Sequence, residues 1–163
     1  MRVLKVVITS ILIGCALVII PLLVPMLAGY KLVVIETGSM EPILHVGSLC
    51  YVKEASIIHE NDIVTYFTGE DNDVLVTHRV IGINMDGTYK LKGDNSNMED
   101  KNRVTDENIM GVTKFNVPYM GYLVQFLATV NGKVLTVGFI VVLSLLTELL
   151  DILIKRKKVR KST

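Results

Sequence analysis

A serine and a histidine are the two side chains of this sequence whose types and surroundings suit nucleophilic chemistry. Ser39 follows Gly38 in the polar turn at residues 37–42, directly after the apolar run at residues 32–35. Such a strand-to-turn boundary can present a hydroxyl on a rigid base. A serine hydroxyl is a weak nucleophile near neutral pH, and it needs a neighbouring base that is itself oriented by a third group. Because most Gly-Ser pairs are ordinary turns, the meaning of Ser39 depends on its partners.

His78 is the histidine best placed to act as that base. It shares the alternate register of Val76 and Val80, which predicts that its ring points to the half-buried face of a strand. His45 and His59 stand in polar loops, where a solvated surface position is expected. A histidine on an apolar face is more often a satisfied core residue than a base, so His78 also needs a partner.

An acidic, amide-rich loop at residues 93–100 supplies candidate partners, Asp94 and Asp100. A loop of this composition is usually a turn. Its Asp-x-Asn spacing also suggests calcium, but an EF-hand loop begun at Asp94 requires glycine and glutamate where this chain has Glu99 and Thr105. We therefore expect no metal site, and the sequence predicts no cofactor.

Three short motifs, taken together and in this order, resemble those of type I signal peptidases. They are Gly38-Ser39-Met40-Glu41-Pro42, Thr77-His78-Arg79-Val80, and Gly93-Asp94-Asn95 with Asp100. They follow an apolar N-terminal segment, and the resemblance covers about residues 5–120. Most bacterial members of the family have a lysine as base, just before an Arg-Val or similar pair, whereas this chain has His78 there. The resemblance is thus to the endoplasmic-reticulum and archaeal type, which also occurs in some Gram-positive, spore-forming bacteria.

The resemblance implies a role for each matching residue. Ser39 would be the nucleophile and His78 the general base. Asp100 would orient the histidine and Asp94 would be a supporting carboxylate, with an exchange of roles between the two left open. Lysine-type relatives have an oxyanion-binding serine two residues before the nucleophile, and Thr37 stands at that position. Thr37 and the backbone N–H of Ser39 are therefore the expected oxyanion hole.

The implied function is that of a membrane-bound serine endopeptidase that cleaves N-terminal signal peptides from exported preproteins after small residues. The implied partners are preproteins and the lipid bilayer, with the secretion machinery left open. Nucleic acid is not expected as a partner, because the basic run near the end of the chain directly follows an apolar segment.

Two other classes stay open. The chain could be a membrane-tethered β module that binds an extracytoplasmic partner without chemistry. It could be a protease of the same fold with another target, as self-cleaving repressors are, although these are soluble and use lysine. A thiol enzyme built on Cys50 is disfavoured, because Cys50 stands inside an apolar run without a Cys-Arg pair. The only other cysteine, Cys15, is also in an apolar segment, so no disulfide framework is expected.

Two apolar segments frame the region that carries the motifs. Residues 6–28 are 23 uncharged positions, enough to cross a hydrocarbon core of roughly 30 Å. Pro21 and Pro25 are expected to kink this helix or end it early. The run exceeds a signal-peptide core, so we expect a retained anchor. A second span of 21 residues is predicted at 134–154, before the basic tail at residues 155–163.

The distribution of charge predicts the orientation in the membrane. Arg2 and Lys5 precede the first span and six basic residues follow the second, whereas residues 30–133 hold nine basic and fourteen acidic residues. The positive-inside rule then puts both termini in the cytoplasm and the intervening region outside it. A bacterial or archaeal plasma membrane is expected, with the endoplasmic reticulum membrane as the alternative.

The region between the spans is predicted to be all-β. Short β-branched or apolar runs separated by Gly, Asn and Asp predict strands, and Met85-Asp86-Gly87 predicts a hairpin turn. The fold class is mainly β: a small extracytoplasmic barrel-like or packed-sheet catalytic domain flanked by two transmembrane helices. The predicted strands are 32–35, 49–52, 63–67, 74–83, 88–91 and 110–115. The predicted divisions are the N-terminal stub and span at 1–29, the β domain at 30–116, an interfacial or domain-packing segment at 117–133, the second span at 134–154 and the cytoplasmic tail at 155–163.

Overall fold

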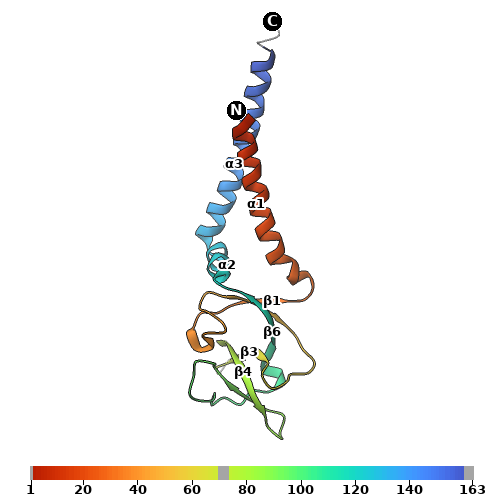
Figure 1. Ribbon diagram of the computed structural model, residues 1–163, viewed down its shortest axis with the longest axis vertical. Coiled ribbons are helices and arrows are strands. Elements are labelled where there is room, and N and C mark those ends of the chain that lie inside the picture. The colour runs from red at the N-terminus through yellow and green to blue at the C-terminus, as the bar shows by residue number, and fades with distance from the viewer. Residues whose placement is uncertain (1, 70–73, 160–163) are drawn as a thin grey trace. The chain divides into compact units, whose positions relative to one another are not determined.

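The computed structural model describes residues 2–69 and 74–159 (Figure 1). Two compact units are present: a helical unit formed by the chain up to Val24 and from Phe126 onward, and a unit at Pro25–Gln125 that contains the strands. The elements follow in the order α1 (Arg2–Leu27), β1 (Lys31–Val34), the 3-10 turn η1 (Gly38–Met40), β2 (Leu49–Lys53), β3 (Ile63–Thr68), β4 (Val74–Ile83), β5 (Tyr89–Lys92), the 3-10 turn η2 (Asp106–Asn108), β6 (Ile109–Val117), α2 (Met120–Ala128) and α3 (Val130–Val159).

The strands form one antiparallel sheet in the order β1-β2-β6-β3-β4-β5. This confirms the predicted mainly-β class with apolar helices at both ends of the chain. The predicted bounds of β4 are those observed, and the other strands differ by one or two residues at their ends. Those ends depend on the pairing partner: β6, for example, extends to Val117 because Val117 pairs with Leu49 of β2.

A cluster of alternate side chains from neighbouring strands forms the core next to β4. Val64 and Tyr66 of β3 pack with Val80 of β4 and Leu91 of β5, all nearly inaccessible to solvent. Because Val64 pairs directly with His78, these two side chains share one face of the sheet. The core therefore fixes the face on which His78 stands.

The turn between β4 and β5 is the hairpin turn predicted at residues 85–87. The backbone N–H of Asn84 donates to Thr88 O at 2.8 Å, and Gly87 has a φ of +80°, which favours glycine. The Asp86 carboxylate accepts hydrogen bonds from the hydroxyl and N–H of Thr88 and pairs with Arg103. These contacts, the Thr88 hydroxyl first, lower the pKa of Asp86 to about 2.

Two helices in the described part of the chain are long and apolar enough to cross a membrane, at Val3–Leu27 and Val130–Leu150. Ile8 and Leu12 of α1 pack against Leu143 and Leu150 of α3. Most of the other apolar side chains on these helices are exposed.

The helices differ in their bounds from the sequence-based expectations. Of the two outcomes expected for Pro21 and Pro25, a kink or an early end, the early end does not occur: each proline removes a single N–H donor, and the remaining bonds carry α1 to Leu27. The second apolar helix begins at Val130, before the predicted 134, and residues 120–128 form the separate helix α2. Residues 155–159 continue α3, whereas the rest of the predicted tail, 160–163, and residue 1 lie outside the described residues.

Shortening a core side chain should destabilise the sheet far more than shortening a surface one. We expect Leu91→Ala to lower the free energy of unfolding by about 2–4 kcal/mol, because Leu91 is 1% exposed and its loss leaves a cavity. Ile81→Ala is the control: Ile81 is 39% exposed and should cost less than about 1 kcal/mol. Denaturant unfolding of the full chain in detergent measures both, and equal losses would contradict this account of the core.

Candidate active site

Ser39 lies in η1, on the connection between β1 and β2. The backbone of Thr37 is still extended, and the chain then turns through Gly38–Met40, with the N–H of Glu41 donating to Gly38 O at 3.1 Å. The side chain of Met40 is buried with Leu44 in a second apolar cluster beside β1 and β2. This burial anchors the turn, and Ser39, next to Met40, is half-buried.

His78 of β4 lies within hydrogen-bonding distance of Ser39. Its Nε2 is 3.1 Å from Ser39 Oγ, and its side chain is only 13% exposed. The ring therefore lies on a largely buried face of the strand. A distance of about 2.6–3.2 Å is the range in which a base can take a proton from a hydroxyl.

Asp100 lies on the opposite side of the imidazole from Ser39. Its Oδ2 is 2.6 Å from His78 Nδ1, and because a carboxylate only accepts, Nδ1 is the nitrogen that donates. In the neutral ring this leaves a lone pair on Nε2, which faces Ser39. Asp100 itself is held by its backbone N–H, which donates to Leu91 O at 2.8 Å.

Tyr66 also contacts Asp100. Its hydroxyl donates to the same carboxylate oxygen, Oδ2, at 2.8 Å. Burial raises the pKa of Tyr66 above its usual value, and the hydrogen bond and negative charge of Asp100 raise it further. Tyr66 is therefore a phenol donor throughout the neutral range.

Asp94 pairs with Arg79 and not with the histidine. The guanidinium donates from Nε to Asp94 Oδ1 at 2.7 Å and from Nη2 to Oδ2 at 2.6 Å, and Nη1 donates to Asn61 O at 2.9 Å. The hydrogen bond to Asp94 raises the pKa of Arg79 although partial burial opposes it. Of the two predicted aspartates, Asp100 is thus the one in contact with His78.

The segment 93–95 packs directly on the Ser39 turn. The backbone N–H of Asn95 donates to Ser39 O at 2.8 Å, and Asn95 Nδ2 donates to Gly38 O at 3.2 Å. A Cβ on Gly93 would lie 2.6 Å from Ser39 O and 3.2 Å from His78 Nε2, so only glycine fits there without displacing neighbours. Neither Asn95 nor Tyr66 has a role that sequence spacing reveals, because both act through contacts with distant segments.

Thr37 lies beside the Ser39 hydroxyl. Its Oγ1 is 3.3 Å from Ser39 Oγ, and Thr37 is exposed. An exposed hydroxyl therefore lies next to Ser39 Oγ, at the residue that precedes η1.

The other two histidines lie away from this arrangement. His59 is exposed, as expected from its loop. His45 is not a freely solvated residue: its Nδ1 is 2.6 Å from Glu41 Oε2, and its ring stacks on Tyr119 with the centroids 6.0 Å apart. The Glu41–His45 contact ties down the chain just after the serine turn.

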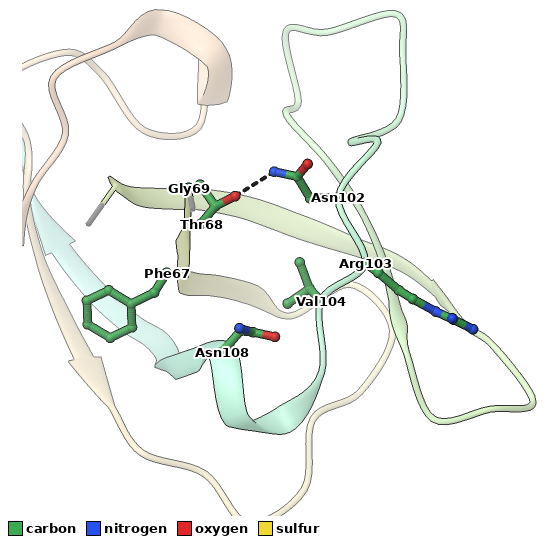
Figure 2. A pocket seen from close by; sticks show the side chains of 7 residues that line it. All are labelled: Phe67, Thr68, Gly69, Asn102, Arg103, Val104 and Asn108. Carbon is green, nitrogen blue, oxygen red and sulfur yellow. Dashed lines mark hydrogen bonds between the residues drawn. The ribbon is translucent and has the colours of Figure 1, made fainter. Parts of the chain in front are cut away.

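A pocket of about 430 Å³ lies beside the end of β3 (Figure 2). Figure 2 shows Asn102 reaching toward Thr68 across its rim, with Phe67, Val104 and Asn108 around it. Ser39, His78, Asp94 and Asp100 are not among its described lining residues. The candidate active site is therefore formed by the hydrogen bonds of His78 with Ser39 and Asp100, and this pocket is not part of it.

The geometry gives a continuous chain of contacts, from the Ser39 hydroxyl through the His78 imidazole to the Asp100 carboxylate. Such an arrangement of nucleophile, base and orienting acid serves acyl transfer on unrelated folds and is recognised by its geometry.

Comparison with known proteins finds signal peptidases among the proteins similar to this chain. The chain is 38% identical over 101 residues to signal peptidase I W of Bacillus subtilis (strain 168), covering 58% of this chain and 52% of the relative. It is 26% identical over 109 residues to the signal peptidase complex catalytic subunit SEC11 of Verticillium alfalfae, covering 60% and 63%. It is 31% identical over 103 residues to the subunit SEC11C of Homo sapiens, covering 55% and 53%. No family model matches the chain.

These relatives confirm the resemblance to type I signal peptidases of the endoplasmic-reticulum and Gram-positive type. The chain spans about half to under two thirds of the lengths of these relatives.

Gly93 gives a direct test of the packing around Ser39. We expect Gly93→Ala to lower the rate of Ser39 acylation by a peptide p-nitrophenyl ester at least tenfold, because the added Cβ would meet Ser39 O and His78 Nε2. Mass spectrometry of the full chain measures the acylated fraction with time. Gly82→Ala is the matched control, since a Cβ at Gly82 makes only ordinary contacts, the nearest at 3.7 Å. An unchanged rate in Gly93→Ala would contradict this packing.

Proposed function

We propose that this chain is a membrane-bound serine endopeptidase that removes N-terminal signal peptides from exported preproteins. The observation that carries the proposal is the Ser39–His78–Asp100 chain of contacts, at 3.1 Å and 2.6 Å, in a protein similar to signal peptidases. The relatives point to the substrate class, and the contacts point to residues that would carry the reaction.

The proposed reaction begins when Ser39 Oγ attacks the carbonyl carbon of the residue before the cut. His78 Nε2 takes the hydroxyl proton, and a tetrahedral intermediate forms. When the C–N bond breaks, His78 gives this proton to the departing amine. A water molecule then attacks the acyl ester while His78 takes its proton, and His78 gives this proton to Ser39 Oγ as the ester C–O bond breaks, which regenerates both residues.

Asp100 would support both steps through His78. Its contact with Nδ1 holds the tautomer in which Nε2 is free to accept a proton. When Nε2 becomes protonated, the carboxylate stabilises the imidazolium. Asp94 would support the site indirectly, because its two hydrogen bonds hold Arg79, the residue that follows His78 on β4.

Thr37 and the backbone N–H of Ser39 are the proposed oxyanion hole. Thr37 Oγ1 lies 3.3 Å from Ser39 Oγ, so its hydroxyl is near the point at which the attacked carbonyl must arrive. Donors placed there act when charge develops on the carbonyl oxygen, and for that reason they accelerate the chemical step.

The two candidate spans would hold the enzyme in the membrane across which its substrates pass. With both termini cytoplasmic, the β domain at residues 30–116 would lie on the extracytoplasmic side of a plasma membrane. Confining enzyme and preprotein to one bilayer surface raises their effective concentration. The small residues before the cut are the preference that the family resemblance implies, and the proposed partners are preproteins, the bilayer and the secretion machinery.

Cleavage of a preprotein in membranes should depend on the three contacting residues. We expect Ser39→Ala and His78→Ala to lower the cleavage rate by about 10⁴-fold or more, and Asp100→Asn by roughly 10²–10⁴-fold. Asp94→Asn should lose less, because Asp94 contacts Arg79 and not His78. Quantitative gel analysis of precursor and mature protein gives the rates. If Ser39→Ala cleaves at the wild-type rate, the proposal fails and a non-catalytic β module becomes the better reading.

The oxyanion role of Thr37 is tested by removing the hydroxyl at nearly constant volume. Thr37→Val should lower kcat roughly 10²-fold with little change in KM, the effect typical of a lost oxyanion donor. Thr37→Ser retains a hydroxyl at the same position and should keep most of the activity. Equal rates for the valine and serine variants would remove Thr37 from the oxyanion hole.

A further inference from the structure

Tyr66 is a buried polar residue that the motif resemblance leaves without a role. It is 2% exposed, and its ring lies in the apolar cluster with Val64, Val80 and Leu91. Its hydroxyl is the part of the side chain that leaves this cluster, and it donates to Asp100 Oδ2 at 2.8 Å. A buried hydroxyl that meets a carboxylate of the candidate site is placed to influence that carboxylate.

Strand register brings Tyr66 to the same face as His78. Tyr66 pairs with Val76 across β3 and β4, and His78 is two residues further along β4, so the two rings are diagonal neighbours. The ring centroids are 6.4 Å apart with a tilt of 57°. Tyr66 and His78 therefore approach Asp100 from adjacent strands.

Both donors converge on one oxygen atom. Asp100 Oδ2 accepts from Tyr66 OH at 2.8 Å and lies 2.6 Å from His78 Nδ1. Two donors on one oxygen fix the rotation of the carboxyl group, and each draws negative charge from it. The strength of the bond to His78 thus depends on the bond to Tyr66.

We propose that Tyr66 is a positioning residue for the peptidase, which orients Asp100 and, through it, the His78 imidazole. This inference rests on the proposed function. Tyr66 is buried and is not expected to touch a substrate, so it would act on the rate through Asp100 and His78 and not on substrate binding.

The direction of the effect follows from the charges around Asp100. His78 from β4 and Tyr66 from β3 are the titratable groups in hydrogen-bond contact with its carboxyl group, and His78 is also in contact with Ser39. Its chain neighbours Glu99 and Lys101 are exposed. Without the Tyr66 hydroxyl, Asp100 Oδ2 keeps more of its negative charge, and this charge attracts the imidazolium that forms on His78 more strongly. Since the reaction needs neutral His78, the acid limb of the pH profile moves upward.

The nearby Arg79–Asp94 pair does not replace this contact. Arg79 uses two of its nitrogen atoms on Asp94 and a third on Asn61 O. The Tyr66 hydroxyl is therefore the donor in the described structure that shares Asp100 Oδ2 with His78.

The variant Tyr66→Phe tests this role, because it removes the hydroxyl and keeps the buried ring. We expect kcat to fall about tenfold at pH 6, KM to stay within about twofold, and the acid limb of kcat/KM to rise by roughly half a pH unit. The assay is cleavage of a preprotein by the full chain in detergent, from pH 5 to 10. Each rate is divided by the concentration of folded protein, which is measured by circular dichroism.

Tyr89→Phe is the matched control. The Tyr89 hydroxyl also donates to a carboxylate, Asp106 Oδ1 at 2.6 Å, but neither residue contacts Ser39, His78 or Asp100 in the described structure. We expect its kcat and pH profile to match the wild type. A similar shift in both variants would overturn the proposal, because the effect would then follow from any lost tyrosine hydrogen bond.

A double-mutant cycle separates positioning from simple stabilisation. In an Asp100→Asn background the hydroxyl has no carboxylate to orient, so adding Tyr66→Phe should lower kcat by less than about twofold. An undiminished tenfold loss would overturn the proposal, as would a wild-type profile for Tyr66→Phe. Ser39→Ala distinguishes a failure of the proposed function from a failure of this inference. If Ser39→Ala retains activity, the proposed function fails. If Ser39→Ala is inactive, the pH profile of Tyr66→Phe decides the role of Tyr66.

Discussion

The hydrogen bond from the Asn95 N–H to Ser39 O is the contact on which the candidate site depends. Ser39 follows β1, at one edge of the sheet, and His78 lies on β4, with β2, β6 and β3 between them in the strand order. No strand pairing therefore brings the two side chains together. The segment after β5 does so, because Asn95 holds the Ser39 turn while Asp100, five residues on, meets His78. Residue 93 must be glycine for this segment to lie against the turn.

The register of β3 against β4 is the second constraint. Side chains alternate across a sheet, so a slip of one residue would move His78 and Tyr66 to the opposite face. The observed register is held from both sides. On one face Val64, Tyr66 and Val80 are buried in the core, and on the other the buried hydroxyls of Thr65 and Thr77 hydrogen-bond at 2.9 Å. The polar pair opposite the apolar cluster thus helps to specify which face carries the histidine.

Local sequence patterns were enough to predict the helices and strands, but they were not enough to predict the contacts between distant segments. Strand β4 and its hairpin turn follow from β-branched alternation and a glycine at positive φ, which are properties of the segment itself. The candidate site residues came from the resemblance of three short motifs to those of type I signal peptidases. The choice between Asp94 and Asp100 as the partner of His78, the contact of Tyr66 with Asp100, and the pairing of His45 with Glu41 all depend on how separate segments meet. Alternation placed Tyr66 in a strand, but only the register against β4 places it beside His78.

The two carboxylates of the loop also explain why histidine suits position 78. Adjacent strand residues project to opposite faces, so Arg79 meets Asp94 on one side of β4 and His78 meets Asp100 on the other. Arg79 neutralises Asp94 through two hydrogen bonds. The side chain at position 78 therefore meets the negative charge of Asp100. In the proposed reaction residue 78 accepts the proton of Ser39, and a lysine that formed an ion pair with Asp100 would be held in its protonated form, which cannot accept that proton. An imidazole has two nitrogens, so it can donate to Asp100 from Nδ1 while Nε2 remains a base.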